Sequence, residues 1–444
     1  HSKIGLLPAV RSAGSVPPRG FKSSVQCEID MRVVVIGHRH LHCAKDRIIG
    51  GGGETFERDL LRHLGGTDNE VIWLTQDSEE LEIPGVTQIN LPIPNSMGMT
   101  KGKRAAQTRR RNNYLSEYLH ELEADFFFNN DDSNVGMCRI LIEIGVPSVT
   151  FHHAAWKESG FRNLMGILPM YKGLVDGGHS VSTVSKANRD KYNEDLLGRG
   201  KFFDEFIEEL RKSPDTFINE YIHPFTIWEK PKAQPSNGRF SLLTRMSDGK
   251  NFKFILDIAK ERKYPIYWFA PTPIQPRDIA IKDRVLKSFP NENVVWDLPR
   301  DQLLDEIGKV EAIIVTGYEA APISAFEANA NGVPVVLVTD IIGHPCTETC
   351  KVGAEGDLYE VLFSNKEERV TKLEELFSNW APKTLSERQA ILDATWEKYN
   401  PEATRNRTMA LMGRTIERVH RISGPPERRA PSENIISMFG VPNA

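Results

Sequence analysis

Residues 317–335 read GYEAAPISAFEANANGVPV, and this stretch decides the predicted organisation of the second half of the chain. The residues just before it, 311–316, and those at its end, 334–339, are apolar runs with the length of buried strands. Pro322 suits the first turn of a helix, and Gly332 suits the position after its last turn. The stretch therefore predicts a strand, a short helix and a second, parallel strand.

Two glutamates in this unit are candidate ligand-binding residues. Glu319 lies at the carboxyl end of the first predicted strand, and Glu327 lies within an otherwise apolar helix. A carboxylate in such a helix needs a polar partner, because burial of an unpaired charge is costly. We expect hydroxyl groups of a ligand to be that partner.

The alternation of strands and helices continues in both directions from this unit. In the second half of the chain, further strands are predicted at 239–244, 264–270 and 293–297. In the first half, short β-branched or aromatic runs predict strands at 31–36, 71–75, 86–91, 125–129, 147–152 and 179–184. The predicted fold class is α/β, with two Rossmann-like, doubly wound parallel-sheet domains that face each other across a ligand cleft.

A polar segment rich in Pro, Lys and Gly, EKPKAQPSNG at 229–238, predicts a linker between the two domains. The predicted division is a leader outside the fold at 1–30, an N-terminal domain at 31–228, the linker at 229–238, a C-terminal domain at 239–385, and helices with a tail at 386–444. Two further expectations are a helical hairpin at 186–212 and an irregular tail beyond Gly424.

Composition excludes several functional classes. With 40% hydrophobic residues the chain can form buried cores, yet no run approaches the roughly 20 apolar residues of a membrane-spanning helix. The net charge of −4 gives no general attraction to polyanions, so a nucleic-acid contact needs a local basic patch. Five dispersed cysteines favour free thiols in a reducing compartment, and we expect a cytoplasmic protein.

Metal and nicotinamide sites have little support in the sequence. Cys346 and Cys350 follow His344 closely, but no second pair of ligands at comparable spacing is evident, so loop thiols are favoured over zinc. Residues 129–132 (NNDD) follow a predicted strand and are interpreted as an acceptor loop that lines the cleft. The dinucleotide pattern Gly-x-Gly-x-x-Gly is absent after Gly37.

Two elements have the residue types of a phosphate site. The four glycines 50–53 precede a helical pattern, and their amides can approach a phosphate or a sugar at the helix start. A flexible loop is the alternative interpretation. Arg245 follows the first strand of the second domain and Lys250 precedes the next helix, a placement suited to a diphosphate. Two solvated loop cations are the alternative there.

Together these motifs resemble the retaining nucleotide-sugar glycosyltransferases of the GT-B fold. The resemblance depends on the Arg-x4-Lys element at 245–250, on the Glu-x7-Glu pair, and on the helix that ends in Asn-Gly-Val-Pro-Val-Val. It includes the glycine-rich loop, Phe151-His152-His153, VSTVSKAN at 181–188 and FINEYI at 217–222, and extends over about 31–400.

The resemblance implies a role for each matched residue. The implied roles are diphosphate binding by Arg245 and Lys250, sugar binding by Glu319, ribose binding by Glu327, phosphate capping by the amides of Ile323 and Ser324, and donor contacts by Gly51, Gly52 and Gly53. His152 is expected beside the anomeric carbon, which makes His152, Arg245, Lys250 and Glu319 the expected catalytic residues. The expected donor is UDP-glucose, and no metal or other cofactor is expected because cations neutralise the diphosphate. The sequence departs from the usual pattern of this family in the alanines that follow Glu319 and in Asn329 and Asn331, where small residues are common. The identity of the sugar therefore stays open.

The acceptor is predicted from a basic run, KGKRAAQTRRR at 101–111, which places six cations at the start of a helix. Arg104, Gln107 and Arg111 would share one face and could follow phosphates, although a charge run is usually a solvated surface. The expected acceptor-binding residues are Arg104, Arg109, Arg110, Arg111, His153 and Arg162.

A short stretch also resembles bacteriophage α-glucosyltransferases that modify hydroxymethylated cytosine in DNA. It comprises His152-His153, FRNLMG at 161–166 and VSKAN at 184–188. The leading expectation is therefore transfer of a hexose to the hydroxymethyl group of a pyrimidine in double-stranded phage DNA, in the cytoplasm of a bacterial or phage-infected cell. The base would have to leave the stack to reach the cleft.

Other functions stay open at this point. A transferase that acts on saccharide or lipid-linked acceptors in polysaccharide synthesis is the main alternative. A sugar-nucleotide epimerase or a glycogen-type phosphorylase shares the architecture. Epimerases tend to lack the combination of Arg-x4-Lys and Glu-x7-Glu, and a phosphorylase would need a pyridoxal-binding lysine, which is not evident here. A non-catalytic carbohydrate- or nucleic-acid-binding protein would not need paired carboxylates beside a diphosphate site.

Overall fold

The computed structural model describes most of the chain between Met31 and Gly424. The described residues are 31–37, 42–44, 47–49, 52–76, 81–94, 99–131, 134–153, 161–190, 217–223, 227–244, 246, 255–256, 266–273, 276–287, 289, 293–317 and 323–424. The predicted leader, the tail beyond Gly424 and most of the predicted hairpin at 186–212 lie outside these residues.

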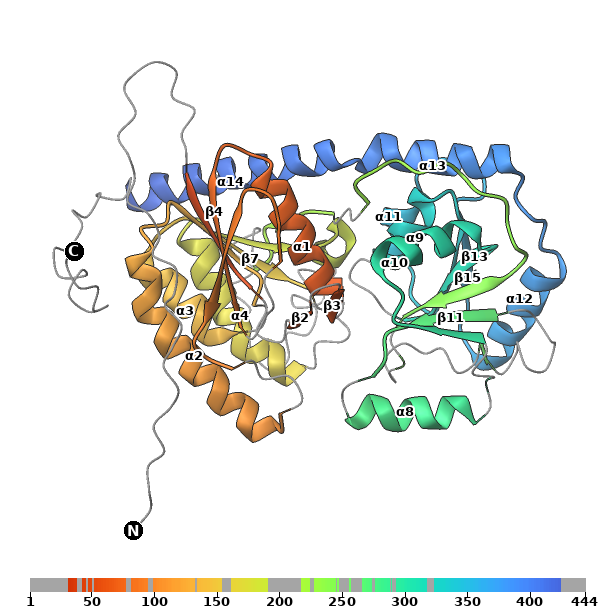
Figure 1. The fold of residues 1–444 in the computed structure, drawn as a ribbon, viewed down its shortest axis with the longest axis horizontal. Coiled ribbons are helices and arrows are strands. Elements are labelled where there is room, and N and C mark those ends of the chain that lie inside the picture. Colours follow the sequence, from red (N-terminus) through yellow and green to blue (C-terminus); the bar gives the residue numbers. More distant parts are fainter. Residues whose placement is uncertain are drawn as a thin grey trace, which may run out of the picture.

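The first half of the chain forms a seven-stranded parallel sheet (Figure 1). In spatial order its strands are β5 (Val86–Leu91), β4 (Glu70–Gln76), β1 (Arg32–Ile36), β6 (Phe126–Asn129), β7 (Ser148–His152), β8 (Ser180–Thr183) and β9 (Glu220–Tyr221). The strand order reverses between β1 and β6. In open α/β sheets, ligands bind outside the carboxyl ends of the strands at such a reversal.

The second half forms a six-stranded parallel sheet with the same kind of reversal. In spatial order its strands are β12 (Val294–Trp296), β11 (Ile266–Ala270), β10 (Phe240–Leu243), β13 (Ala312–Val315), β14 (Val335–Thr339) and β15 (Leu358–Leu362). Here the order reverses between β10 and β13, so the predicted strand–helix–strand unit begins at the reversal. A short antiparallel hairpin, β2 (His42–Ala44) and β3 (Arg47–Ile49), precedes the first helix.

Helices cover both faces of each sheet, which is why the strands are buried apolar runs. In the first half, α1 (Gly52–Gly65) packs on one face, and α2 (Lys101–Glu121), α3 (Val135–Ile144) and α4 (Phe161–Asp176) pack on the other. In the second half, α8 (Pro276–Leu286) and α12 (Lys366–Ser378) cover one face, and α9 (Arg300–Lys309), α10 (Ile323–Ala330) and α11 (Pro345–Cys350) cover the other. Side chains alternate along β1, so that Val33 and Val35 contact the α1 layer while Val34 and Ile36 contact the α2–α4 layer.

The last two helices connect the halves again. Figure 1 shows α13 (Leu385–Tyr399) beside the second sheet and α14 (Pro401–Ser423) returning along the first. The return is fixed by polar contacts: Thr415 Oγ1 lies 2.5 Å from Ser180 Oγ, and Arg418 pairs with Glu220 at 2.8 Å.

The predicted strands agree with the observed ones to within one or two residues wherever a strand was expected. The prediction missed β15, β9 and the β2–β3 hairpin, which are short or partly exposed. The predicted end of the α10 helix is confirmed. Gly332 has a φ of +75°, and a Cβ there would overlap the carbonyl oxygen of Arg388 in α13.

Candidate active site

The carboxyl edge of the first sheet gathers the polar residues that follow its strands. Gly37 follows β1, Asn130 follows β6 and His153 follows β7. Because parallel strands end at one edge, these residues lie beside the first turn of α1, which contains Gly53. A Cβ on Gly53 would lie 3.4 Å from Cδ2 of the His153 ring. This is an ordinary contact distance, so the imidazole packs directly against the start of the helix.

The two adjacent histidines have different surroundings. His152 is 1% exposed, and its Nδ1 lies 2.9 Å from the hydroxyl of Tyr171 in α4. The His153 ring instead packs against Phe56 of α1, with 5.2 Å between ring centroids. Neighbouring side chains at the end of a strand project to opposite faces of the sheet. His153, rather than His152, therefore lies beside the glycine-containing start of α1.

A chain of hydrogen bonds leads from His153 into the core. Nε2 of His153 is hydrogen-bonded to the side-chain oxygen of Asn130. The Asn130 amide donates to Oε2 of Glu57 and, at 3.3 Å, to the carbonyl of Gly53. The indole Nε1 of Trp73 donates to Oε1 of Glu57 at 2.6 Å. Both oxygens of this fully buried carboxylate therefore accept hydrogen bonds.

Arg111 belongs to the core, which corrects the prediction that Arg104, Gln107 and Arg111 share an exposed face. Arg111 is 1% exposed, pairs with Asp131, and donates to the carbonyl of Gly37 at 2.8 Å. Gln107 is also buried and donates to a main-chain carbonyl at 2.6 Å. This face of α2 packs on the sheet, so its polar groups bond to the protein and are not available to an acceptor phosphate.

Three other predicted acceptor residues, Arg104, Arg109 and Arg110, are exposed on α2. Within the described part of the chain, none of the three forms an ion pair. Because α2 follows a parallel strand, its first turns lie toward the carboxyl edge of the sheet, the edge at which His153 lies. Arg162 lies in the first turn of α4, and its side chain is outside the described part of the structure.

In the second domain, Glu327 of α10 is 2% exposed and pairs with Arg300 at the start of α9. Burial alone would lower the pKa of Arg300, but the pairing with Glu327 raises it. Ile323 and Ser324 are the first two residues of α10. The polar partner of the buried Glu327 carboxylate is therefore Arg300, a side chain of the same protein. The sequence did not indicate this pairing.

Two charges of α1 lie near this pair. Asp59 is 3% exposed and accepts a hydrogen bond from Trp228 Nε1 at 3.1 Å, and burial raises its pKa. Arg58 Nε lies 3.9 Å from Asp59; burial lowers the pKa of Arg58, and the nearby charge of Arg300 acts in the same direction. Charged groups from both domains therefore influence one another where α1 approaches α9.

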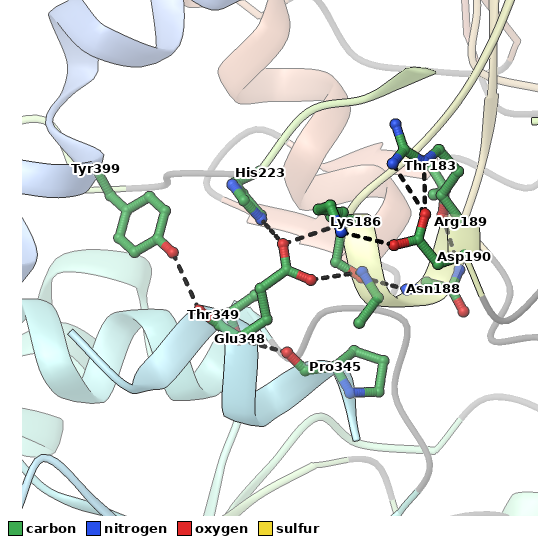
Figure 2. A network of polar contacts seen from close by, with 12 residues as sticks. Thr183, Lys186, Asn188, Arg189, Asp190, His223, Pro345, Glu348, Thr349 and Tyr399 are labelled. Atoms are coloured by element: carbon green, nitrogen blue, oxygen red, sulfur yellow. Dashed lines mark hydrogen bonds and ion pairs between the residues drawn. The ribbon is translucent and has the colours of Figure 1, made fainter. Parts of the chain in front are cut away.

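A second interdomain contact is built around Glu348 of α11 (Figure 2). Its carboxylate accepts from the backbone amides of Lys186 and Ala187, at 3.1 and 2.5 Å, and lies 2.8 Å from His223 Nε2. Burial would raise the pKa of Glu348, but the hydrogen bonds from His223 and the two amides lower it. The His223 ring also meets Tyr399 of α13 edge-on. This contact holds the second domain against the segment that follows β8.

Four of the predicted site residues, Gly51, Arg245, Lys250 and Glu319, lie outside the described residues. Gly52 is the first residue of α1. The structure therefore brings together Gly53 and His153 in the first domain and Ile323, Ser324 and Glu327 in the second.

The Cys346, Cys350 and His344 group is a structural element in the described chain. His344 caps α11 by accepting from the Cys346 amide at 3.0 Å. The two thiols are buried, with their sulfur atoms 3.5 Å apart. No group of three metal-binding side chains occurs among the described residues. Nor is any helix in those ranges long and apolar enough to cross a bilayer.

Sequence reasoning missed Glu57, Asn130 as a hydrogen-bonding residue, and Arg300. Glu57 lies within a helix next to buried Phe56, and Arg300 precedes the apolar residues of α9. A charged residue next to apolar residues in a helical pattern indicates a buried polar contact, and Glu57 and Arg300 show this signal as Glu327 does. Their partners could not be identified because the contacts join elements distant in sequence.

Comparison with known proteins supports the fold. A scan against protein families and a search of curated protein sequences find no match. Among solved structures, sucrose-phosphate synthase from Thermosynechococcus elongatus is similar at a TM-score of 0.60 and 12% identity, over 86% of this chain and 98% of that one. HepE from Anabaena, in complex with UDP and glucose, is similar at 0.59 and 12% identity, over 86% and 99%. A glycosyltransferase from Rickettsia africae is similar at 0.55 and 12% identity, over 88% and 99%. With its two parallel sheets, the chain has a GT-B fold.

Proposed function

We propose that this chain is a retaining glycosyltransferase that transfers a hexose from UDP-glucose to an acceptor hydroxyl. The observation that carries the proposal is the buried Glu327 at the strand-order reversal of the second sheet, one turn into α10. A carboxylate has several acceptor sites, so Glu327 can accept from ribose hydroxyls while it pairs with Arg300. Solved complexes of HepE, which has a similar fold, contain UDP-glucose, and this supports the choice of donor.

In this proposal the second domain binds the donor. Glu327, held by Arg300, accepts hydrogen bonds from the ribose, and the amides of Ile323 and Ser324 at the start of α10 bind phosphate. Arg245 and Lys250 stabilise the diphosphate as it leaves, and Glu319 binds the sugar. Since the two cations serve the leaving group, the proposed chemistry requires no metal ion.

The first domain contributes the other side of the site. We revise the role expected of His152 and assign it to His153, because His152 is buried against Tyr171 while His153 lies beside Gly53. Gly51, Gly52 and Gly53 form the approach to the sugar and phosphate.

The donor proposal is tested by single substitutions. Arg245→Ala and Lys250→Ala should each lower turnover by about 10²–10³-fold, because each removes a preorganised charge from the leaving group. Glu327→Gln should mainly raise KM for UDP-glucose, since a ribose contact is made equally in the ground and transition states. Arg139→Ala, on the exposed surface of α3, is the matched control. Near-native turnover in both cation variants would contradict the diphosphate assignment.

Binding and stereochemistry complete this test. UDP should stabilise the parent protein in a thermal-shift titration, by an amount set by the ratio of its concentration to its Kd. The anomeric configuration of the product, read by NMR, should match that of the donor; inversion would contradict the retaining mechanism.

For the acceptor we propose DNA that contains hydroxymethylated pyrimidines. The exposed cations Arg104, Arg109 and Arg110 near the carboxyl edge of the first sheet favour a polyanionic acceptor. Arg111 is not included because it pairs with Asp131 in the core.

The acceptor proposal is tested by replacing Arg104, Arg109 and Arg110 with Ser. For DNA, the slope of log K against log salt should become shallower by up to about 0.9 for each phosphate that the variant no longer neutralises, with UDP affinity unchanged. The control replaces exposed Arg139, Arg407 and Arg421 with Ser, which removes the same charge elsewhere. If the parent does not bind DNA at about 50 mM salt, or if the triple variant transfers sugar like the parent at every salt concentration, a saccharide acceptor replaces DNA.

A further inference from the structure

The hydrogen bonds that join Glu57, Asn130 and His153 indicate which atom donates at each step. Glu57 is fully buried, and in its ionised form a carboxylate can only accept hydrogen bonds. Its two oxygens meet the indole N–H of Trp73 and the side chain of Asn130. The amide group of Asn130 must therefore turn its NH2 toward Glu57. The carbonyl of Gly53, also an acceptor, lies 3.3 Å from the same nitrogen and favours the same orientation.

The orientation of Asn130 determines what it presents to the imidazole. With its NH2 on Glu57 and Gly53, its carbonyl oxygen faces Nε2 of His153. An oxygen acceptor at hydrogen-bond distance requires that Nε2 carry the proton. In the neutral ring, Nδ1 then has the lone pair.

We propose that Glu57 and Asn130 are positioning residues that fix His153 as the Nε2–H tautomer, so that its Nδ1 is the acceptor nitrogen. The inference rests on the proposed function, in which His153 lies beside the transferred sugar. It adds a specificity: any group that meets Nδ1, whether of the protein or of a ligand, must be a donor such as a hydroxyl, and not a phosphate oxygen.

The second domain contains a control for the structural part of this arrangement. Glu311 is also buried, and it accepts from Trp380 Nε1 at 2.7 Å and from Ser236 Oγ. This carboxylate–indole pair matches that of Glu57 and Trp73, but it lies directly before β13, at the amino end of the sheet. Disruption of a buried Glu–Trp pair can therefore be separated from loss of control over His153.

The decisive variant is Glu57→Gln. A glutamine carboxamide has one acceptor oxygen for two donors, Trp73 N–H and the Asn130 NH2. When Asn130 turns over to relieve the donor–donor contact, it presents its NH2 to Nε2 of His153, and the ring proton moves to Nδ1. Asn130→Ala removes the oxygen acceptor altogether, so that neither tautomer is enforced.

The readout is the tautomer, measured by ¹⁵N NMR on histidine-labelled full-length protein without ligand. His153→Gln identifies the resonance among the twelve histidines. The parent should show Nε2–H, and Glu57→Gln and Asn130→Ala should populate Nδ1–H. Asn112 of α2 forms a pair of side-chain hydrogen bonds with Asn134 and is the control for loss of an asparagine amide. Glu311→Gln and Asn112→Ala should leave the spectrum of His153 unchanged. If Glu57→Gln does not fold, Asn130→Ala and Asn130→Ser carry the test. A parent with Nδ1–H, or variants that retain Nε2–H, would overturn the proposal.

Kinetics connect the tautomer to the reaction. Glu57→Gln should lower turnover about 10- to 100-fold through misplacement of the imidazole, with the Kd for UDP unchanged, whereas Glu311→Gln should retain parental turnover. Equal loss of turnover in the two variants would reduce Glu57 to a structural role. Failure of the parent to bind UDP would refute the donor proposal and leave the tautomer result standing, so the two failures are distinguishable.

Discussion

Each domain contains a buried carboxylate that is hydrogen-bonded to an indole. Each also contains a buried arginine that donates to main-chain carbonyl groups. The two domains place these groups at opposite ends of their sheets. In the first domain, Glu57 and Arg111 lie at the carboxyl edge, where their partners Asn130 and Asp131 follow β6. In the second domain, the corresponding groups lie at the amino edge.

There, Glu311 accepts hydrogen bonds from Trp380 and from Ser236, which precedes β10, and Arg388 donates to the carbonyls of Val310 and Gly308. The same kinds of interaction thus connect chain segments at the amino edge of one sheet and support the loops at the carboxyl edge of the other. The direction of the strands decides which role a buried polar cluster has, since ligands approach open α/β sheets at their carboxyl ends.

The largest expected difference is between the two buried arginines. Arg111→Met should lower the free energy of unfolding by about 3–5 kcal/mol, because it leaves the Asp131 carboxylate buried without its cation. Arg388→Met should cost less, about 1–3 kcal/mol, since the groups that lose donors are the carbonyls of Val310 and Gly308. Glu311 loses a nearby positive charge but keeps its hydrogen bonds from Trp380 and Ser236. Urea denaturation of the two variants measures both values. An equal or greater loss in Arg388→Met would remove the distinction between the two clusters.

Acid should weaken the first domain at a higher pH than the second. Burial lowers the pKa of His63 from 6.5 to about 4, and the same cause lowers that of His179 to about 4. Between pH 6.5 and about 4, the two histidines are protonated in the unfolded chain but stay neutral in the folded domain. The free energy of unfolding therefore falls as the pH drops through this range. In the second domain, Lys372 lowers the pKa of Glu368 from 4.5 to about 2. The stabilisation that ionised Glu368 provides is therefore lost only below pH 4.5.

The variant that checks this window is His63→Phe, which retains an aromatic ring beside Trp228. A pKa shift of this size lowers the free energy of unfolding of the parent by about 3 kcal/mol between pH 6.5 and 4. The variant should not show this decrease. Unfolding free energies at pH 7 and pH 4 give the result. If the parent and the variant weaken in parallel, His63 is not responsible.

The smallest expected effect separates backbone conformation from close packing. Gly332 in the second domain and Gly145 after α3 in the first have φ values of +75° and +71°. Gly145→Ala should cost about 1 kcal/mol, because a Cβ there meets nothing within 4 Å. Gly332→Ala should cost about 2–3 kcal/mol, because its Cβ also overlaps the backbone of Arg388. Equal shifts in thermal unfolding would show that α13 moves aside without cost.

The sequence by itself determined the order of the main strands and the position of Glu327 in a helix that ends before Gly332. These are local properties: apolar runs, helix-start prolines and helix-end glycines act over a few residues, and parallel strands buried on both faces leave a strong apolar pattern. Strands with weaker patterns, such as β15, were missed for the same reason.

The tertiary structure alone decided which polar groups meet. His152 and His153 are adjacent in the sequence, but the alternation of side chains at the end of β7 puts one against Tyr171 and the other against α1. Arg111 belongs to a basic run, yet it pairs in the core with Asp131. Such pairings join segments that are distant along the chain, and their free energy depends on burial and geometry, which composition and spacing do not contain.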